Sequence, residues 1–288
     1  MISKPLSCEQ WRVAGGRFET SSGPLFTRTE GAGRAVLLIH GFPTASWDWA
    51  RIWPALSRRF RCLAFDMIGF GYSVKPRDFG YSIHAQADLC EAFMTAQRVQ
   101  EYAIVAHDYG DTVAQELLAR HAEGRARQGL TRVVLLNGGL FPETHRPVLI
   151  QKLLASPLGP LVARLTTYRK FAASMRQICA RPLADADLEG MWRLMTFNNG
   201  LAVLPKLIGY MAERRQHRER WVGGLQKSIV PVRLINGLRD PVSGAHMVAR
   251  FRELVARPDV VELADVGHYP QIESPEAVAE AAIDFLDH

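Results

Sequence analysis

Short apolar runs alternate with helical patterns along the first half of the chain, and this alternation restricts the possible folds more than any other feature. The runs are rich in Val, Leu, Ile and Ala and lie at 35–40, 61–66, 103–107 and 132–137. A continuous apolar run of this length is typical of a strand covered on both faces. Helical segments such as HAQADLCEAFMTAQRV lie between the runs. The sequence therefore predicts an α/β fold with a mostly parallel, doubly wound sheet, preceded by an antiparallel hairpin around the turn SSGP.

The alternation stops at about residue 138 and resumes at about residue 225. Between these points the pattern is helical, and prolines interrupt it at 142, 147, 157, 160, 182 and 205. Apolar runs at 230–236 and 260–263 then continue the sheet. We therefore expect a core domain formed by 1–137 and 225–288, with a helical cap inserted at 138–224.

The composition is that of a globular protein, with 288 residues of which 48% are hydrophobic and 22% charged. This balance excludes disordered and collagen-like chains. The net charge of +6 is spread out, and its one dense stretch, ERRQHRER at 213–220, carries its own glutamates. That pattern favours a solvated helix face over a site for a polyanion, so nucleic acid is not expected as a partner.

Cofactor and membrane signals are missing from the sequence. The four cysteines lie far apart, and neither a metal-ligand spacing nor a glycine-rich phosphate loop occurs, so no cofactor and no metal are expected. No window has the apolar length of a membrane span, and the first residues lack the apolar core of a secretory signal. We expect a cytoplasmic monomer or homodimer that acts on a small molecule.

Three polar residues follow three different strands in the order that a catalytic triad would need. In VAHDYGDT, Asp108 takes the place of the serine in a strand–turn–helix nucleophile elbow. Asp240 follows RLINGLRD, and His268 lies in ELADVGHYPQIESPE. Taken singly, these residues could be a helix N-cap, a turn residue and a loop histidine. Because ligand-contacting residues gather beyond the carboxyl ends of parallel strands, their joint occurrence predicts an active site.

The motifs HGFP, DMIGFGYS, HDYG, LRDPV and GHYPQIESPE resemble those of the α/β-hydrolase superfamily over nearly the whole chain. The resemblance is narrower to the branch of epoxide hydrolases and haloalkane dehalogenases with an aspartate nucleophile. The blocks HDYGDTVAQELL and NGGLFPETHRP are similar to those of the mesoderm-specific transcript protein group. The resemblance implies an α/β-hydrolase fold, the nucleophile Asp108, and an oxyanion hole made by the backbone N–H groups of Phe42 and Tyr109.

A carboxylate nucleophile suits attack on a saturated carbon, because the product is an alkyl ester rather than an anhydride. His268 would then activate the water that hydrolyses this ester, with Asp240 orienting the imidazole. The leading hypothesis is opening of an epoxide on an apolar substrate. The alternatives are dehalogenation through the same ester and a binding or scaffold protein without turnover.

The predicted cap supplies the residues that would distinguish these hypotheses. Tyr210 resembles the lid tyrosine that donates a proton to an opening epoxide, and Tyr168 is the weaker candidate for a second donor, with His145 as a substitute. Both tyrosines could instead be packing residues. Trp192 could line the substrate channel or belong to the core. Neither Phe42 nor Tyr109 offers a side-chain N–H to a halide, which weakens the dehalogenase alternative.

Overall fold

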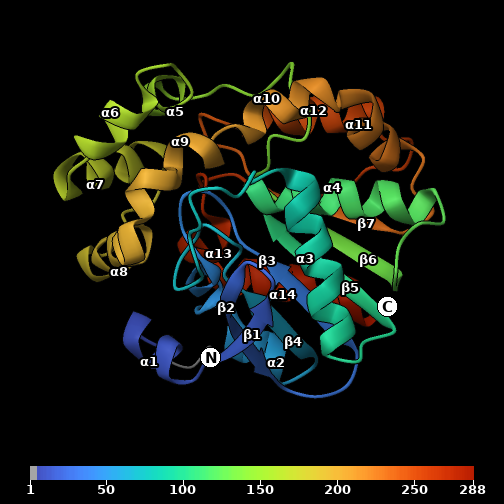
Figure 1. The fold of residues 1–288 in the computed structure, drawn as a ribbon. Helices are drawn as coiled ribbons and strands as arrows, with labels where there is room; N and C mark the ends of the chain where they lie inside the picture. The colour runs from blue at the N-terminus through green and yellow to red at the C-terminus, as the bar shows by residue number, and fades with distance from the viewer. Residues whose placement is uncertain (1–4) are drawn as a thin grey trace.

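The computed structural model describes residues 5–288 and contains one eight-stranded sheet in the order β1-β2-β4-β3-β5-β6-β7-β8 (Figure 1). The hairpin strands β1 and β2 are antiparallel, and the pairs from β4 to β8 are parallel. The doubly wound, mostly parallel sheet is therefore confirmed, as is the hairpin before it. The strands are β1 Gly16–Thr20, β2 Gly23–Glu30, β3 Ala35–Ile39, β4 Arg61–Phe65, β5 Glu101–His107, β6 Gly129–Leu136, β7 Val232–Gly237 and β8 Asp259–Leu263.

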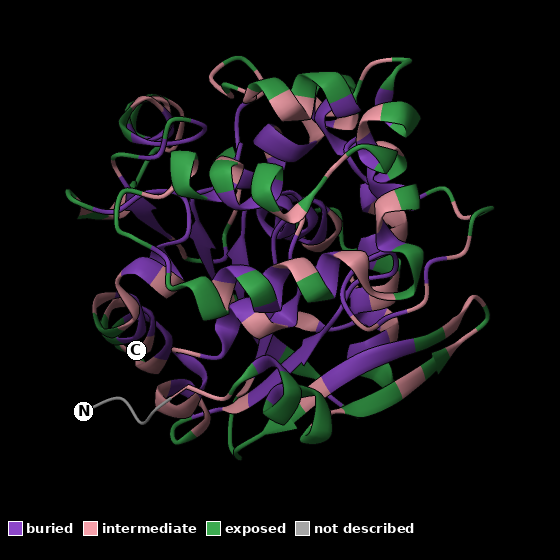
Figure 2. Ribbon diagram, turned by 90° about the vertical axis from the view of Figure 1, so that its left-hand side faces the viewer, coloured by how far each residue is buried: buried purple, intermediate pink, exposed green. Residues whose placement is uncertain are grey.

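Both faces of the sheet are covered, which explains why its strands are continuous apolar runs. In β3, Leu37 and Ile39 join the core that packs on α3 and α4, whereas Val36 and Leu38 join the core on the α2 and α14 side. Figure 2 shows the buried strands between helices whose outer sides are exposed. The helices around the sheet are α1 Cys8–Val13, η1 Ser46–Trp49, α2 Trp53–Ser57, α3 Ile83–Ala96, α4 Tyr109–Ala122, α12 Ala245–Leu254, α13 Pro270–Glu273 and α14 Pro275–Asp287.

The stretch between β6 and β7 forms only helices, which Figure 1 shows at the top and left of the molecule. Its apolar residues continue the core on the α3 and α4 side, so this stretch packs directly on the sheet domain. We propose that it acts as a cap. Its helices are α5 Leu149–Leu154, α6 Gly159–Arg164, α7 Tyr168–Ile178, α8 Asp185–Thr196, η2 Phe197–Val203, α9 Leu204–Leu207, α10 Tyr210–Gln216 and α11 Arg218–Gln226.

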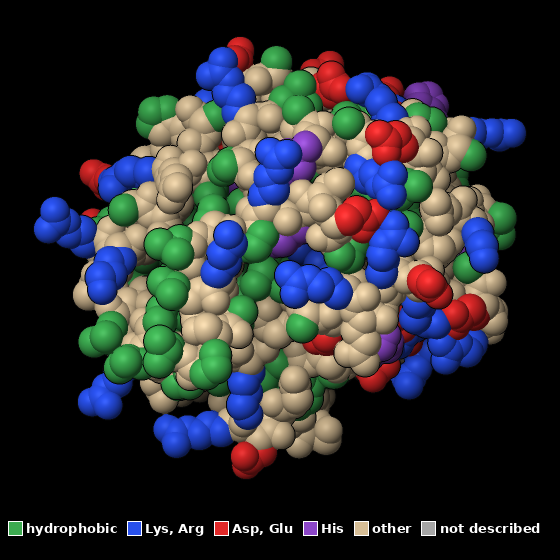
Figure 3. Space-filling model, turned by 90° about the horizontal axis from the view of Figure 1, so that it is seen from above, with side chains coloured by type: hydrophobic (Ala, Val, Ile, Leu, Met, Phe, Trp, Pro, Cys, Tyr) green, Lys and Arg blue, Asp and Glu red, His purple; other side chains and the backbone are tan. Residues whose placement is uncertain are grey.

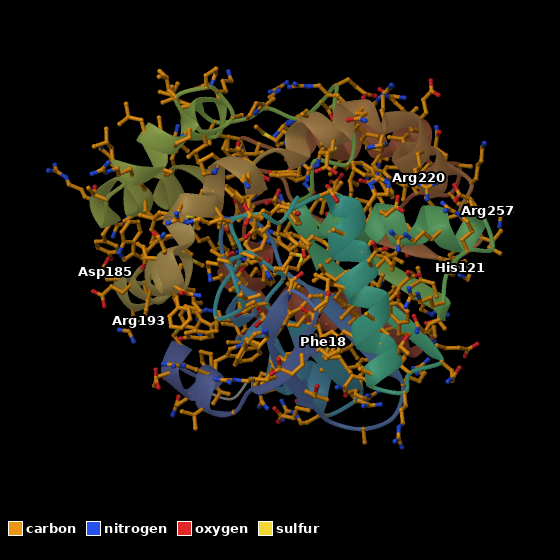
Figure 4. The ribbon with its side chains drawn as sticks, in the orientation of Figure 1. Phe18, His121, Asp185, Arg193, Arg220 and Arg257 are labelled. Carbon is orange, nitrogen blue, oxygen red and sulfur yellow. The ribbon has the colours of Figure 1, made fainter. Side chains whose placement is uncertain are left out.

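The last of these helices, α11, packs closely along α4. Gly224 lies so near that an added Cβ would stand 3.1 Å from the Ala119 backbone. The buried carboxylate of Glu116 accepts hydrogen bonds from Trp221 Nε1 and Arg220 Nε, both at 2.8 Å. Figure 4 shows Arg220 on this side of the molecule. This half of the cap is therefore tied to α4, the helix that directly follows Asp108. Within the described chain, no helix has the length and apolar content needed to cross a bilayer.

Candidate active site

The turn after β5 holds the Asp108 side chain at the carboxyl end of the strand. Asp108 has φ 48° and ψ −102°, a backbone conformation that costs about 1 to 3 kcal/mol. Two glycines allow the close approach that this turn needs. A Cβ on Gly110 would lie 2.3 Å from the Ile39 carbonyl oxygen, and one on Gly41 would lie 3.0 Å from the Asp108 Cβ. The strand, tight turn and helix thus present an acidic side chain where a nucleophile elbow presents its nucleophile.

Asp240 and His268 are joined directly. His268 Nδ1 lies 2.7 Å from Asp240 Oδ2. The same carboxylate accepts hydrogen bonds from Asn137 Nδ2 at 3.0 Å, from the Ser243 hydroxyl at 2.8 Å and from the Val242 N–H at 2.7 Å. These contacts fix the imidazole through Nδ1 and leave Nε2 as the ring nitrogen available for acid–base chemistry.

The negative charges of Asp240 and Asp108 favour the protonated form of His268 in the resting site. Burial opposes the charge on His268, but the charge of Asp240, its hydrogen bond and the charge of Asp108 raise the pKa of His268 to about 9. Burial also opposes the charge on Asp240, yet His268 and the neighbouring donors hold the pKa of Asp240 below its usual value. Near neutral pH the two residues therefore form an ion pair. His268 must lose its proton before it can act as a base.

One oxygen of the Asp108 carboxylate is held by the backbone. The N–H of Phe42 donates a hydrogen bond to Asp108 Oδ2 at 3.1 Å. Tyr109 begins α4 beside the carboxylate, but its backbone N–H makes no hydrogen bond to Asp108 in the described structure. Phe42 and Tyr109 both lie beside Asp108, and their shared role in an oxyanion hole stays a prediction. Oδ1 is the carboxylate oxygen left without a backbone donor.

Arg214 faces this free oxygen from the cap. Its Nη2 lies 3.8 Å from Asp108 Oδ1 and donates a hydrogen bond to the Asp108 carbonyl at 3.0 Å. Its Nε donates to the Thr112 hydroxyl at 2.7 Å. The guanidinium is almost fully buried, and its Nη1 has no hydrogen-bond partner among the described residues. A buried cation with a free N–H donor therefore stands beside the candidate nucleophile.

Tyr210 and His145 complete this polar side of the site. The Arg214 guanidinium stacks on the Tyr210 ring at 4.5 Å, and the buried Tyr210 hydroxyl has no partner among residues that the structure describes. Burial and the Asp108 charge raise the pKa of Tyr210, so the phenol stays protonated at neutral pH. Burial and the Arg214 charge lower the pKa of His145 to about 3, so this imidazole is neutral. A Cβ on Gly139 would meet both Arg214 Nη1, at 2.3 Å, and His145 Nδ1, at 2.7 Å.

The interpretation of 213–220 as a solvated helix face is wrong for its second residue. Arg214 points inward because it lies four residues after Tyr210, one helical turn along the same face. Glu213 is also used, since its carboxylate accepts a hydrogen bond from the Ile83 N–H at 3.0 Å. The i,i+4 spacing of Tyr210 and Arg214 is the sequence signal that could have placed Arg214 on the inward face of the helix. Charge counting alone could not separate the inward arginine from its exposed neighbour Arg215.

An apolar cavity of about 90 Å³ borders the site. Phe42, Val242 and His268 line it from the core, and Ile150, Leu154, Phe171 and Met175 are among the residues that line it from the cap. Small-molecule sites usually have about 300 Å³ or more, so this space is small for a substrate site.

His268 is the one member of the predicted triad that lines this cavity; Asp108, Tyr210 and Arg214 do not line it, and neither do the two residues proposed to bind substrate, Tyr168 and Trp192. The rings of Tyr168 and Trp192 contact one another, with centroids 6.2 Å apart, and neither residue is among those lining the cavity. Their contact with substrate stays a prediction. Across the described chain, no group of three or more His, Cys, Asp or Glu side chains is placed to hold a metal ion.

Comparison with known proteins supplies three findings. The family described as alpha/beta hydrolase fold matches residues 34–275. Mesoderm-specific transcript protein of Mus musculus is 37% identical over 292 residues, covering 96% of this chain and 87% of the relative. Two solved structures have the same fold with a TM-score of 0.78. A loop variant of haloalkane dehalogenase DbeA from Bradyrhizobium elkanii is 22% identical, with 95% and 96% of the two chains covered. The epoxide hydrolase CorEH is 17% identical, with 95% and 98% covered.

Proposed function

The chain belongs to the alpha/beta hydrolase fold family, and from that premise we propose that it hydrolyses an epoxide on an apolar small molecule through an ester on Asp108. The observation that carries the proposal is the surroundings of one carboxylate. Asp108 Oδ2 accepts the Phe42 N–H, Oδ1 has no backbone donor and faces Arg214 at 3.8 Å, and the Asp108 charge acts on His268, which is paired with Asp240. The apolar cavity beside His268 suits an apolar substrate.

In the first step, Asp108 Oδ1 attacks a ring carbon and forms a C–O ester bond while the epoxide C–O bond breaks. The electron pair stays on the ring oxygen, which takes the proton of the Tyr210 phenol. Arg214 stabilises the negative charge on that oxygen and then on the phenolate. Formation of the ester removes the negative charge of the Asp108 carboxylate.

The second step requires that His268 has first lost its proton to solvent. Water then attacks the ester carbonyl carbon while the neutral His268 takes a proton from it at Nε2. The Phe42 N–H stabilises the oxyanion formed at Oδ2, a contribution of about 3 to 4 kcal/mol for a donor of this kind. The bond between the carbonyl carbon and Oδ1 then breaks, and Oδ1 leaves in the product as its second hydroxyl. His268 gives the proton that it took from water to the leaving Oδ1. The second proton of that water, left on the Asp108 carboxyl, passes to the Tyr210 phenolate, so that Asp108 is again a carboxylate.

The test is a single turnover of an aryl-substituted epoxide in heavy-oxygen water. The label should appear in Asp108 and not in the first diol released, because Oδ1 supplies that oxygen. In a His268→Gln variant, the intact mass of the protein should rise by the mass of the substrate. Full activity of an Asp108→Ala variant, with label directly in the diol, would refute the proposal. A scaffold protein would form no adduct with any electrophile.

Dehalogenation is the second candidate, and one observation favours it. Although position 109 is a tyrosine, Arg214 Nη1 is a buried N–H donor without a partner beside Asp108, and such a donor could receive a halide ion. The ester and its hydrolysis would be the same. Release of halide from short haloalkanes, with no diol from epoxides, would select this candidate.

A further inference from the structure

The segment 144–184 carries seven Lys and Arg residues and no Asp or Glu. All seven cations are exposed. Within the described structure, Arg176 pairs with Asp185, but no carboxylate lies within ion-pair distance of the other six, which are Arg146, Lys152, Arg164, Arg169, Lys170 and Arg181. A stretch of one sign over three helices creates a local positive field that the chain does not neutralise.

Five leucines are exposed on the same segment, with 37% to 71% of their surface accessible. Leu149 and Leu153 are four residues apart on α5. Leu158, Leu161 and Leu165 follow the i, i+3, i+7 spacing of one face along α6 and its two ends. Because α5 and α6 pack together, the two rows form one surface, here called the leucine face. Figure 3 shows hydrophobic side chains gathered on one part of the cap, with Lys and Arg around them.

The opposite side of α5 lines the cavity beside His268. Ile150 and Leu154 point toward that cavity, whereas Leu149 and Leu153 are exposed. One short helix thus separates the leucine face from the candidate substrate site. The exposed leucines are not needed to close the cavity, so the fold itself gives no reason for apolar residues at these positions.

We propose that the leucine face docks the protein on a bilayer that contains anionic phospholipid. The leucines would enter the boundary between headgroups and acyl chains, and the cations of 144–184 would lie against lipid phosphates. A second copy of this chain is a poor occupant, because a two-fold interface would place the same cations opposite one another. Nucleic acid would match the charge but not the leucines. The docking does not depend on the chemistry proposed for Asp108.

The experiment is cosedimentation of the full chain with vesicles of phosphatidylcholine, alone or mixed with phosphatidylglycerol. Binding is expected to the mixed vesicles and to weaken as salt is added. The double variant Leu158→Glu with Leu161→Glu should lose at least about ten-fold in affinity. The double variant Lys152→Gln with Arg164→Gln should lose roughly 25-fold, at about five-fold for each cation near an anionic surface.

Matched controls lie outside the segment. Ile229→Glu changes a side chain that is 87% exposed, and Arg58→Gln with Arg257→Gln removes two exposed cations. Figure 4 shows Arg257 on the side of the molecule opposite α7 and α8. These variants should bind like the wild type, and circular dichroism should show that all variants fold.

Three results would overturn the proposal. The first is that the wild type does not bind mixed vesicles. The second is that the segment variants and the controls lose the same affinity for vesicles. The third is that the wild type self-associates and that Leu158→Glu with Leu161→Glu abolishes this self-association. The last result would identify a second copy as the occupant.

Discussion

The pKa of His268 leads to the most detailed prediction, which concerns the rate of ester hydrolysis as pH is raised. With a pKa of about 9, about one molecule in a hundred has a neutral His268 at pH 7. If the base had this pKa in the ester, hydrolysis would be about 100-fold slower at pH 7 than on its alkaline plateau. The structure makes this figure an upper limit. The Asp108 charge helps to raise the pKa of His268, and ester formation removes that charge.

Formation of the ester should therefore lower the pKa of the base that is needed next. The perturbation that isolates this effect is Asp108→Asn, which imitates the uncharged ester with little change in shape. The pKa of His268, followed by nuclear magnetic resonance of its ring, should be lower in Asp108→Asn than in the wild type. Asp240→Asn should lower it further, because Asp240 is the charge that raises it most.

The kinetic assay follows the Asp108 ester by mass spectrometry after rapid quenching, from about pH 6 to about pH 10. The rate constant for ester decay should rise with pH and level off with an apparent pKa below 9. A rate that is constant over this range would refute the reasoning. So would an apparent pKa that is higher in the ester than in the free enzyme.

The stability of the protein should show the opposite pH dependence. The pKa of His268 is raised from 6.5 to about 9 on folding, which corresponds to about 3 kcal/mol favouring the protonated folded state. This stabilisation is complete below about pH 6.5 and is lost as pH rises through about 9. The melting temperature should fall over that interval, and a His268→Gln variant should show a smaller fall.

Three further predictions follow from other contacts. Burial opposes the charge on Glu116, but its hydrogen bonds from Arg220, Arg120 and Trp221 lower the pKa of Glu116 to about 2. Glu116→Gln should cost about 3 to 5 kcal/mol in urea unfolding at pH 7. The loss should shrink as pH falls from about 4.5 towards 2, and an unchanged loss at low pH would contradict the ion-pair explanation. Gly110→Ala should destabilise the fold by about 1 to 3 kcal/mol, because its Cβ would lie 2.3 Å from the Ile39 carbonyl oxygen; wild-type stability would show that the turn can relax. Arg214→Gln should slow formation of the Asp108 ester by about 10² to 10³-fold and leave its hydrolysis nearly unchanged. A rise in KM with unchanged kcat would instead assign Arg214 to substrate binding.

The sheet and the order of the candidate triad could be predicted because both depend on local signals. Strands buried on two faces are continuous apolar runs, and the residues that follow parallel strands meet at one edge of the sheet. Asp240 and His268 can therefore be expected near one another, and their side chains are in hydrogen-bond contact; their catalytic roles stay a prediction. Asn137 ends an apolar run and is therefore expected at the same edge of the sheet, but the sequence does not predict that Asn137 and Ser243 donate hydrogen bonds to Asp240, because a hydrogen bond between distant loops leaves no periodic pattern in the sequence.

The cap was predicted only as a helical insertion. Which face of each helix turns inward depends on packing between segments far apart in the chain. For this reason the sequence does not predict the inward position of Arg214. The contact of Tyr168 and Trp192 with substrate stays a prediction, because which residues meet the substrate also depends on how the cap packs. The exposed leucines of α5 and α6 were missed for the same reason, because amphipathic spacing predicts a buried face as readily as a docking face.

The contacts of α10 and α11 with α4 distinguish two halves of the cap, one formed by α10 and α11 and the other by α5 and α6. Arg214 and Tyr210 are on the half that is fastened to the core, whereas no side-chain hydrogen bond or ion pair joins α5 or α6 to the core in the described structure. The cap can therefore open by movement of α5 and α6 away from the core, while α10 and α11 stay in place. Substrate could pass and product could leave while the groups beside the carboxylate stay aligned, so successive cycles would not have to rebuild the reacting geometry.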